Sequence, residues 1–119
     1  MYRTVKIGNK DINLLANGAT PIRYRMVFGR DILSELQKAD QDGGLMASSI
    51  SELTYIMAMS ADDSVDMSKI NVNTYVKWLE QFEAFDITMA ADQIIDVYMG
   101  NTKTTSEIKK KASGKVSGS

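Results

Sequence analysis

The sequence predicts an α+β protein that is mainly α-helical, with an N-terminal β-hairpin, about five helices and a disordered, basic C-terminal tail. Residues alternate in type around Gly8, and later segments carry apolar residues three and four positions apart. Beyond Gly100 the composition changes to Thr, Ser, Lys and Gly. A chain of 119 residues has room for one hydrophobic core. We therefore expect one helical domain over residues 1–100 and a flexible tail over residues 101–119.

The first elements are predicted from alternation and from cap residues. Thr4–Ile7 and Asp11–Leu14 alternate in type on either side of a glycine-containing turn, which predicts the hairpin. A short helix is expected from Pro21 to Phe28, because Thr20 offers a capping hydroxyl and proline is favoured at the first helical position. Gly29 is expected to end this helix.

The second and third helices are predicted from caps and helical spacing. Asp31 is expected to cap the second helix. In that helix Ile32, Leu33 and Leu36 are expected to face inward, and Ser34, Glu35, Gln37 and Lys38 outward. Residues 40–44 form a polar loop by composition. The third helix is expected to begin at Ser49, which would form a capping box with Glu52.

The segment from Asn73 to Met99 predicts two helices with almost no break between them. The first has an aromatic face formed at helical spacing by Tyr75, Trp78, Leu79 and Phe82. Asn71 or Asn73 is expected to cap this helix, and Asp86 to cap the last one. Gly100 is expected to end the last helix.

The third helix and the last helix carry more apolar residues than a single buried face requires. Core packing, in which methionine fills irregular gaps, is the commoner explanation for such an excess. The alternative is an adaptable surface for a client or for a second copy of the chain. On that interpretation the partner-binding residues are Tyr55, Met57, Met59, Met89, Ile95 and Met99.

Composition narrows the classes of function. The chain has no cysteine and no histidine, and so lacks disulfides, thiol nucleophiles and the commonest general base and zinc ligand. An enzyme is therefore not expected, and neither is a cofactor or a metal. No segment approaches the ~20 apolar residues of a membrane span, and residues 1–10 do not resemble a secretory signal. We expect a cytoplasmic protein with no membrane partner.

The formal net charge of -1 conceals an uneven distribution. Residues 1–100 carry 9 Lys and Arg against 14 Asp and Glu, whereas residues 101–119 carry 5 Lys against 1 Glu. The body is acidic, and the basic tail has no aromatic side chain on which a base could stack. A nucleic-acid partner is therefore not expected.

Four segments carry a resemblance to a known family. They are IGNKDINLLANGATPIRYRMVFGRDIL near the start, SELTYIMAMSA and WLEQFEAFDI in the middle, and IIDVYMGNTKTTSEIKKK at the end. In this order and spacing the chain, up to about Lys111, resembles the tail assembly chaperones of long-tailed phages and prophages of Gram-positive bacteria. None of these segments is a catalytic motif.

The resemblance implies a non-enzymatic protein of the host bacterial cytoplasm that is absent from the mature virion. Such a protein binds the tape measure protein and keeps it soluble during tail tube assembly, and many copies per client imply a homo-oligomer. Genes of this family often make a longer, frameshifted product whose extension contacts the tail tube protein. Lys109-Lys110-Lys111 suits a slippery site for such a frameshift, and a solvated tail explains the same lysines equally well.

Three other functions compete with the chaperone. A structural tail or neck completion subunit retained in the virion is the main alternative, and purified particles would contain it. A small regulatory or DNA-binding helical domain is disfavoured by the acidic body and by the lack of a basic recognition helix. An enzyme holding a divalent ion on Asp62, Asp63 and Asp66 would melt at a higher temperature with metal, but their spacing does not match a calcium loop.

Overall fold

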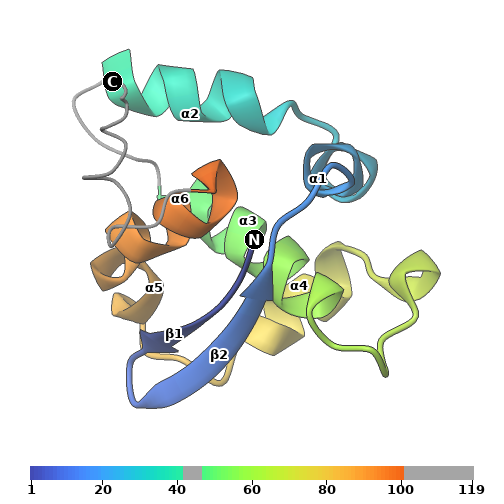
Figure 1. Ribbon diagram of the computed structural model, residues 1–119, viewed down its shortest axis with the longest axis vertical. Helices are drawn as coiled ribbons and strands as arrows, with labels where there is room; N and C mark the ends of the chain where they lie inside the picture. Colours follow the sequence, from blue (N-terminus) through green and yellow to red (C-terminus); the bar gives the residue numbers. More distant parts are fainter. Residues whose placement is uncertain (42–46, 101–119) are drawn as a thin grey trace.

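The computed structural model describes residues 1–41 and 47–100, which form a two-stranded sheet and the helices packed around it (Figure 1). The elements in chain order are β1 (Tyr2–Ile7), β2 (Lys10–Leu15), α1 (Thr20–Phe28), α2 (Ile32–Gln41), α3 (Ala47–Ser60), the 3-10 helix η1 (Met67–Lys69), α4 (Val72–Leu79), α5 (Asp86–Met89) and α6 (Ala91–Met99). The predicted α+β, mainly helical class is confirmed. The predicted tail over residues 101–119 and most of the predicted loop 40–44 lie outside the described residues, whereas residues 40 and 41 end α2.

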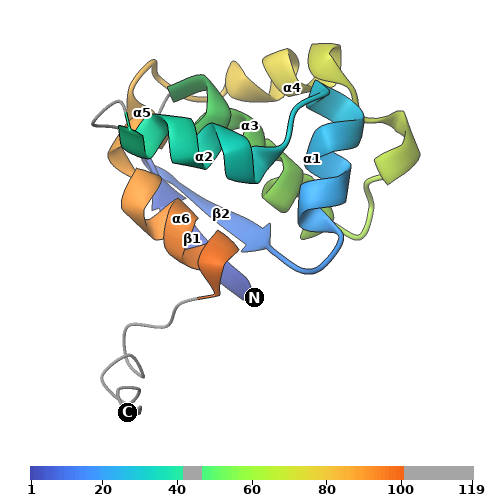
Figure 2. The same cartoon turned by 90° about the horizontal axis from the view of Figure 1, so that it is seen from above.

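The hairpin forms one wall of the hydrophobic core. Its strands are antiparallel, in a register that pairs Val5 with Ile12. Val5, Ile7 and Leu14 are buried on the same side of the hairpin, as the alternation of side chains in a strand requires. Helix α3 packs along β2, and α6 contacts both strands (Figure 2). The core therefore extends from the hairpin to α3, and the other helices add buried side chains around α3.

Gly8 makes the hairpin turn at a point where the chain approaches Asp86. Its φ of 64° lies in the left-handed region that glycine adopts most readily. A Cβ on Gly8 would clash with the Asp86 carboxylate, whose Cγ would be 2.8 Å away. That carboxylate also accepts a hydrogen bond from the Glu83 N–H at 2.9 Å. Moving the Asp86 side chain aside would therefore cost a hydrogen bond.

We expect Gly8→Ala to lower the free energy of unfolding by about 1–3 kcal/mol, through the left-handed φ and the clash together. Urea denaturation of the full chain measures this change. Gly18→Ala is the matched control, because Gly18 has no positive φ and its Cβ would meet nothing within 4 Å. Equal losses in the two variants would contradict the close approach at Gly8.

The start of α1 differs from the prediction. Ala19 is the N-cap and Thr20 is the first helical residue. The Thr20 hydroxyl instead accepts a hydrogen bond from the Asn17 N–H at 2.9 Å, and the Asn17 side chain accepts one from the Ala19 N–H at 2.9 Å. The capping prediction was wrong because the Thr20 hydroxyl closes the preceding turn. At the other end Gly29, with φ of 74°, ends the helix as predicted.

Helix α2 has the predicted cap but a different buried face. The Asp31 carboxylate accepts a hydrogen bond from the Leu33 N–H at 3.0 Å. Leu33 was expected to face inward and is 55% exposed, whereas Glu35 was expected to face outward and is buried. The predicted capping box at Ser49 and Glu52 is also wrong, because α3 begins at Ala47. Both side chains bind partners on other helices, as described below.

The segment after η1 forms three helices where two were predicted. Asn71 caps α4 and forms a capping box with Thr74. The predicted last helix is divided at Ala90, whose φ of -97° and ψ of 7° separate α5 from α6. Asp86 is therefore the first residue of α5 rather than the cap of one long helix. Gly100, with φ of 76°, ends α6 as predicted.

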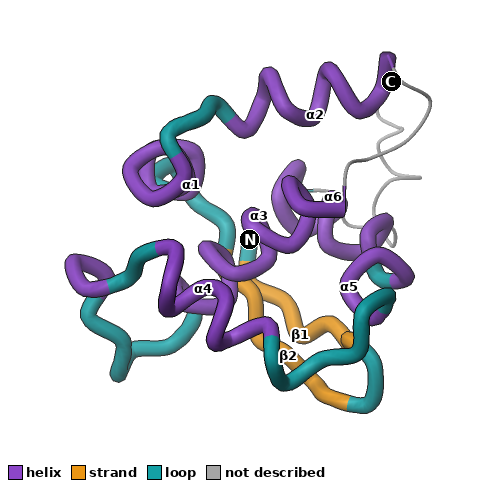
Figure 3. The backbone as a smooth tube through the Cα atoms, turned by 180° about the vertical axis from the view of Figure 1, so that it is seen from behind, coloured by secondary structure: helices purple, strands orange, loops and turns teal. Residues whose placement is uncertain are grey.

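A row of aromatic side chains joins α1, α3 and α4. Figure 3 shows the backbone of these three helices from behind. The rings follow one another in the order Tyr24, Phe28, Tyr75, Tyr55, Trp78 and Phe82. Neighbouring ring centroids lie 5.0–5.5 Å apart, the separation at which tilted and edge-to-face pairs are favourable. The predicted aromatic face of the Trp78 helix thus packs into the core, with Phe82 just beyond the end of α4.

Candidate partner-binding surface

The six predicted partner-binding residues differ in how much of their surface is exposed. Tyr55 and Met57 are buried, with 1% and 0% of their surface exposed. Met59 and Ile95 are half-buried against the core. Met89 and Met99 are exposed. In this fold Tyr55 and Met57 are core residues, and Met89 and Met99 are the predicted residues that lie at the surface.

The reason lies in the position of α3. This helix contacts β2 and all five other α-helices of the described residues, so that it is enclosed on every side. A helix surrounded in this way is apolar all round without offering a surface to a partner. Tyr55 packs between Tyr75 and Trp78, and its hydroxyl lies 2.7 Å from the Thr74 hydroxyl. The apolar excess of α3 is core packing.

Six of the nine large apolar side chains that are exposed in the described residues occur as pairs spaced by four residues, whereas Tyr2, Leu33 and Met99 do not. The pairs are Ile22 and Met26 on α1, Val72 and Val76 on α4, and Phe85 and Met89 at α5. Each of these side chains is about half exposed or more. Residues four apart lie on the same side of a helix, so that each pair forms a short apolar ridge. Only Met89 of these six was among the predicted residues. The signal for the others is a pair of apolar residues four positions apart on a helix face other than the one that packs into the core.

The ridge on α1 borders a groove between α1 and η1. The groove has a volume of about 400 Å³, and its lining residues are Arg23, Met26, Val27, Met67, Ser68 and Ile70. Val27 and Ile70 pack against the core and form its inner side. Two of the other lining residues are methionines, whose flexible side chains adapt to different partner surfaces. This is an apolar groove beside an exposed apolar ridge.

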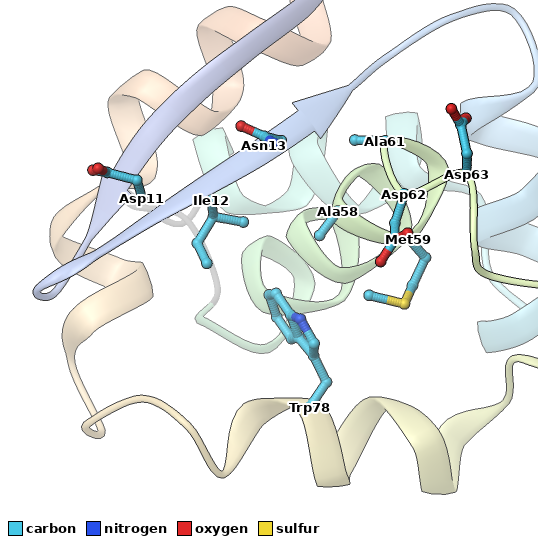
Figure 4. A pocket seen from close by; sticks show the side chains of 9 residues that line it. All are labelled: Asp11, Ile12, Asn13, Ala58, Met59, Ala61, Asp62, Asp63 and Trp78. Carbon is cyan, nitrogen blue, oxygen red and sulfur yellow. The ribbon is translucent and has the colours of Figure 1, made fainter.

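A second cleft, of about 300 Å³, lies between β2, the end of α3 and α4 (Figure 4). Trp78 points from α4 toward Ile12 and Ala58. Asp11 and Asp63 also line the cleft, but their carboxylates point away from the indole ring. Asp62 is the third acidic lining residue, and its carboxylate points toward the side of the cleft that holds Trp78, away from those of Asp11 and Asp63. The three acidic groups therefore do not converge on one point of this cleft.

The loop aspartates of the enzyme alternative are bound within their own turns. The Asp62 carboxylate accepts hydrogen bonds from the Ser64 hydroxyl and N–H, at 2.6 and 2.9 Å. Asp66 binds Ser68 in the same way, at 2.6 and 3.0 Å. These bonds hold the pKa of both aspartates below the usual range. Within residues 1–41 and 47–100, no group of three His, Cys, Asp or Glu residues is placed to hold a metal ion.

A buried polar network lies behind the α1 ridge and joins α1, α2 and α3. The Arg30 guanidinium donates to Glu35 at 3.2 Å and to Glu52 at 2.6 Å. The Tyr24 hydroxyl donates to the other Glu52 oxygen at 2.6 Å, and the Ser49 hydroxyl donates to Glu35 at 3.0 Å. Both glutamates are buried. These contacts explain why Glu35, Ser49 and Glu52 do not behave as local sequence patterns predict.

The network shifts the pKa values of Glu35 and Tyr24. The hydrogen bond from Ser49, with the nearby charges of Lys38 and Arg30, holds the pKa of Glu35 below its usual range. Burial and the bond to Glu52 raise the pKa of Tyr24, so that its hydroxyl stays a donor. The network therefore holds a carboxylate and a neutral phenol in place at neutral pH. We interpret it as the support that positions α1 and its exposed ridge.

Comparisons with known proteins assign no family to this arrangement. No protein-family model, curated protein or solved structure matches the chain. Among the helices in the described part of the chain, none combines the length and the apolar character needed to cross a bilayer.

Proposed function

We propose that this chain is a non-enzymatic tail assembly chaperone of a long-tailed phage or prophage. It binds the tape measure protein and keeps it soluble until the tail tube forms around it. The observation that carries this proposal is the exposure of three apolar ridges, on α1, α4 and α5, by a domain that also has a complete core. The resemblance of the sequence to such chaperones supports the same function.

A long helical client needs a partner that covers its exposed apolar stripe and later leaves. A helix with an exposed apolar stripe aggregates unless another surface covers that stripe. Each ridge of this chain has only two large apolar side chains, so that a single contact is weak and reversible. Several weak contacts along one client add up to useful affinity. They can still be displaced one at a time when tube subunits arrive.

Co-expression with the tape measure protein of the same phage or prophage tests the proposal. We expect a tagged form of the full chain to retain the tape measure protein, with many copies of the chain per client. Native mass spectrometry of the purified complex would give the ratio. Recruitment of the tail tube protein is proposed only for a longer, frameshifted form. Recovery of the chain without the tape measure protein would contradict the proposal.

Purified tails separate the chaperone from a structural subunit. A chaperone leaves before the tail is complete, and we therefore expect no peptide of this chain in the mature particle. A fixed number of copies in every particle would instead identify a tail or neck completion subunit.

A further inference from the structure

Three basic residues lie on the two elements that border the groove between α1 and η1. Arg23 lines the groove, and Lys69 lies on η1 between two lining residues. Arg25 is exposed on α1, next to Met26. Helix α1 has no acidic residue. The ion pairs within residues 1–41 and 47–100 involve none of these three cations.

The charge on α1 and η1 is opposite in sign to the net charge of residues 1–100. Residues 1–100 have 14 acidic residues against 9 basic ones, and three of those nine lie on α1 and η1. The acidic residue next to η1 is Asp66, and its carboxylate accepts hydrogen bonds from the Ser68 N–H and hydroxyl. These hydrogen bonds lower the pKa of Asp66 and keep its carboxylate charged, so that the excess of positive charge at this edge comes from Arg23 and Arg25 on α1.

The charges flank the apolar ridge on both sides. Helical spacing of 100° per residue places Arg23 on one side of the line from Ile22 to Met26 and Arg25 on the other. A helix with its side chains is about 10–12 Å across, so that the groove takes side chains and not a whole helix. An approaching helix would lie along the ridge and insert apolar side chains into the groove.

We infer that the groove between α1 and η1 docks an amphipathic helix of the client whose apolar stripe is flanked by glutamate or aspartate. The inference rests on the proposed function, since it takes the helical client from there and adds the chemistry of the bound segment. Acidic flanks would meet Arg23, Arg25 and Lys69, while the apolar stripe covers Ile22 and Met26. Charge complementarity of this kind selects the partner and its orientation.

Two synthetic helical peptides test the inference. They have the same length and the same leucine stripe, with glutamate at the flanking positions of one and lysine at those of the other. Fluorescence anisotropy would measure their binding to the full chain. We expect the glutamate peptide to bind at least about tenfold more tightly, since like charges across an interface are strongly disfavoured. Met26→Glu, at a side chain that is 78% exposed, should weaken binding without disturbing the core.

Charge reversal at the groove provides the matched comparison. The double variant Arg25→Glu, Lys69→Glu should lose or invert the preference for the glutamate peptide. The control Lys10→Glu, Lys77→Glu changes the net charge equally at exposed positions on β2 and α4, and should keep the preference. Equal binding of both peptides to the unaltered chain would overturn the inference. A preference that survives reversal at the groove would overturn it as well.

Two further outcomes concern the occupant. If the chain alone forms dimers by analytical ultracentrifugation and Met26→Glu dissociates them, a second copy covers the groove and the client assignment is wrong. If the tape measure protein is retained but the peptides show no charge preference, the proposed function survives and this inference fails. If the peptides show a clear charge preference but the tape measure protein is not retained, the proposed function fails. The groove then keeps its preference for acidic helices, but the tape measure protein is not its client.

Discussion

Replacing Glu52 with glutamine lowers the free energy of unfolding by about 1–3 kcal/mol, the cost of leaving a buried hydrogen-bonding group unsatisfied, because the ion pair with Arg30 is only partly buried. The Glu52 carboxylate accepts hydrogen bonds from Arg30 and from Tyr24, both at 2.6 Å. Glutamine keeps the size of the side chain but removes one of the two carboxylates that compensate the guanidinium, the other being that of Glu35. Its amide NH2 group would also face either the Arg30 guanidinium or the Tyr24 hydroxyl, so that two hydrogen-bond donors would oppose each other. Chemical denaturation at neutral pH measures the loss.

Two comparisons make the Glu52 prediction specific. Glu80→Gln makes the same chemical change at an exposed position and should alter stability by less than about 0.5 kcal/mol. In an Arg30→Met background the loss from Glu52→Gln should be smaller, because no guanidinium loses a carboxylate partner. Equal losses with and without Arg30 would show that the ion pair is not what Glu52 contributes.

Met57→Ala lowers the free energy of unfolding by about 2–5 kcal/mol, the range for truncating a buried methionine. Met57 is fully enclosed by the core, so that alanine leaves a cavity behind. The matched control is Met89→Ala, at a methionine that is 84% exposed, where we expect a change below about 0.5 kcal/mol. Similar losses from the two substitutions would contradict the separation of core methionines from surface methionines.

Elements governed by local chemistry were predictable from the sequence. The hairpin around Gly8, the cap at Asn71 and the helix ends at Gly29 and Gly100 are as expected. Each depends on a conformation or a hydrogen bond made within a few residues. Local rules failed where a distant partner competes for the same atoms. Ser49 has the spacing of a cap, yet its hydroxyl binds Glu35 on α2.

The binding surface was less predictable than the fold. An apolar excess on a helix indicates either burial in the core or a partner-binding surface. The two are distinguished by how many other helices and strands pack against that helix. Tyr55 and Met57 lie on a helix that is covered on every side, which one sequence does not reveal. Ile22 and Met26 lie in the helix predicted from Pro21 to Phe28. They are exposed because the opposite face of this helix, which carries Tyr24, is the buried one.

The soluble fraction of the tape measure protein tests the proposed chaperone function most directly. It would be measured after co-expression with the full chain and with a triple variant that places one charge on each ridge: Met26→Glu, Val76→Glu and Met89→Glu. The control is Asn73→Glu, Lys77→Glu and Gln93→Glu, at exposed polar positions. We expect the unaltered chain and the control to keep the tape measure protein soluble, and the ridge variant to leave it in the pellet. An equal soluble fraction in all cases, or without the chain, would contradict a chaperone that acts through these ridges.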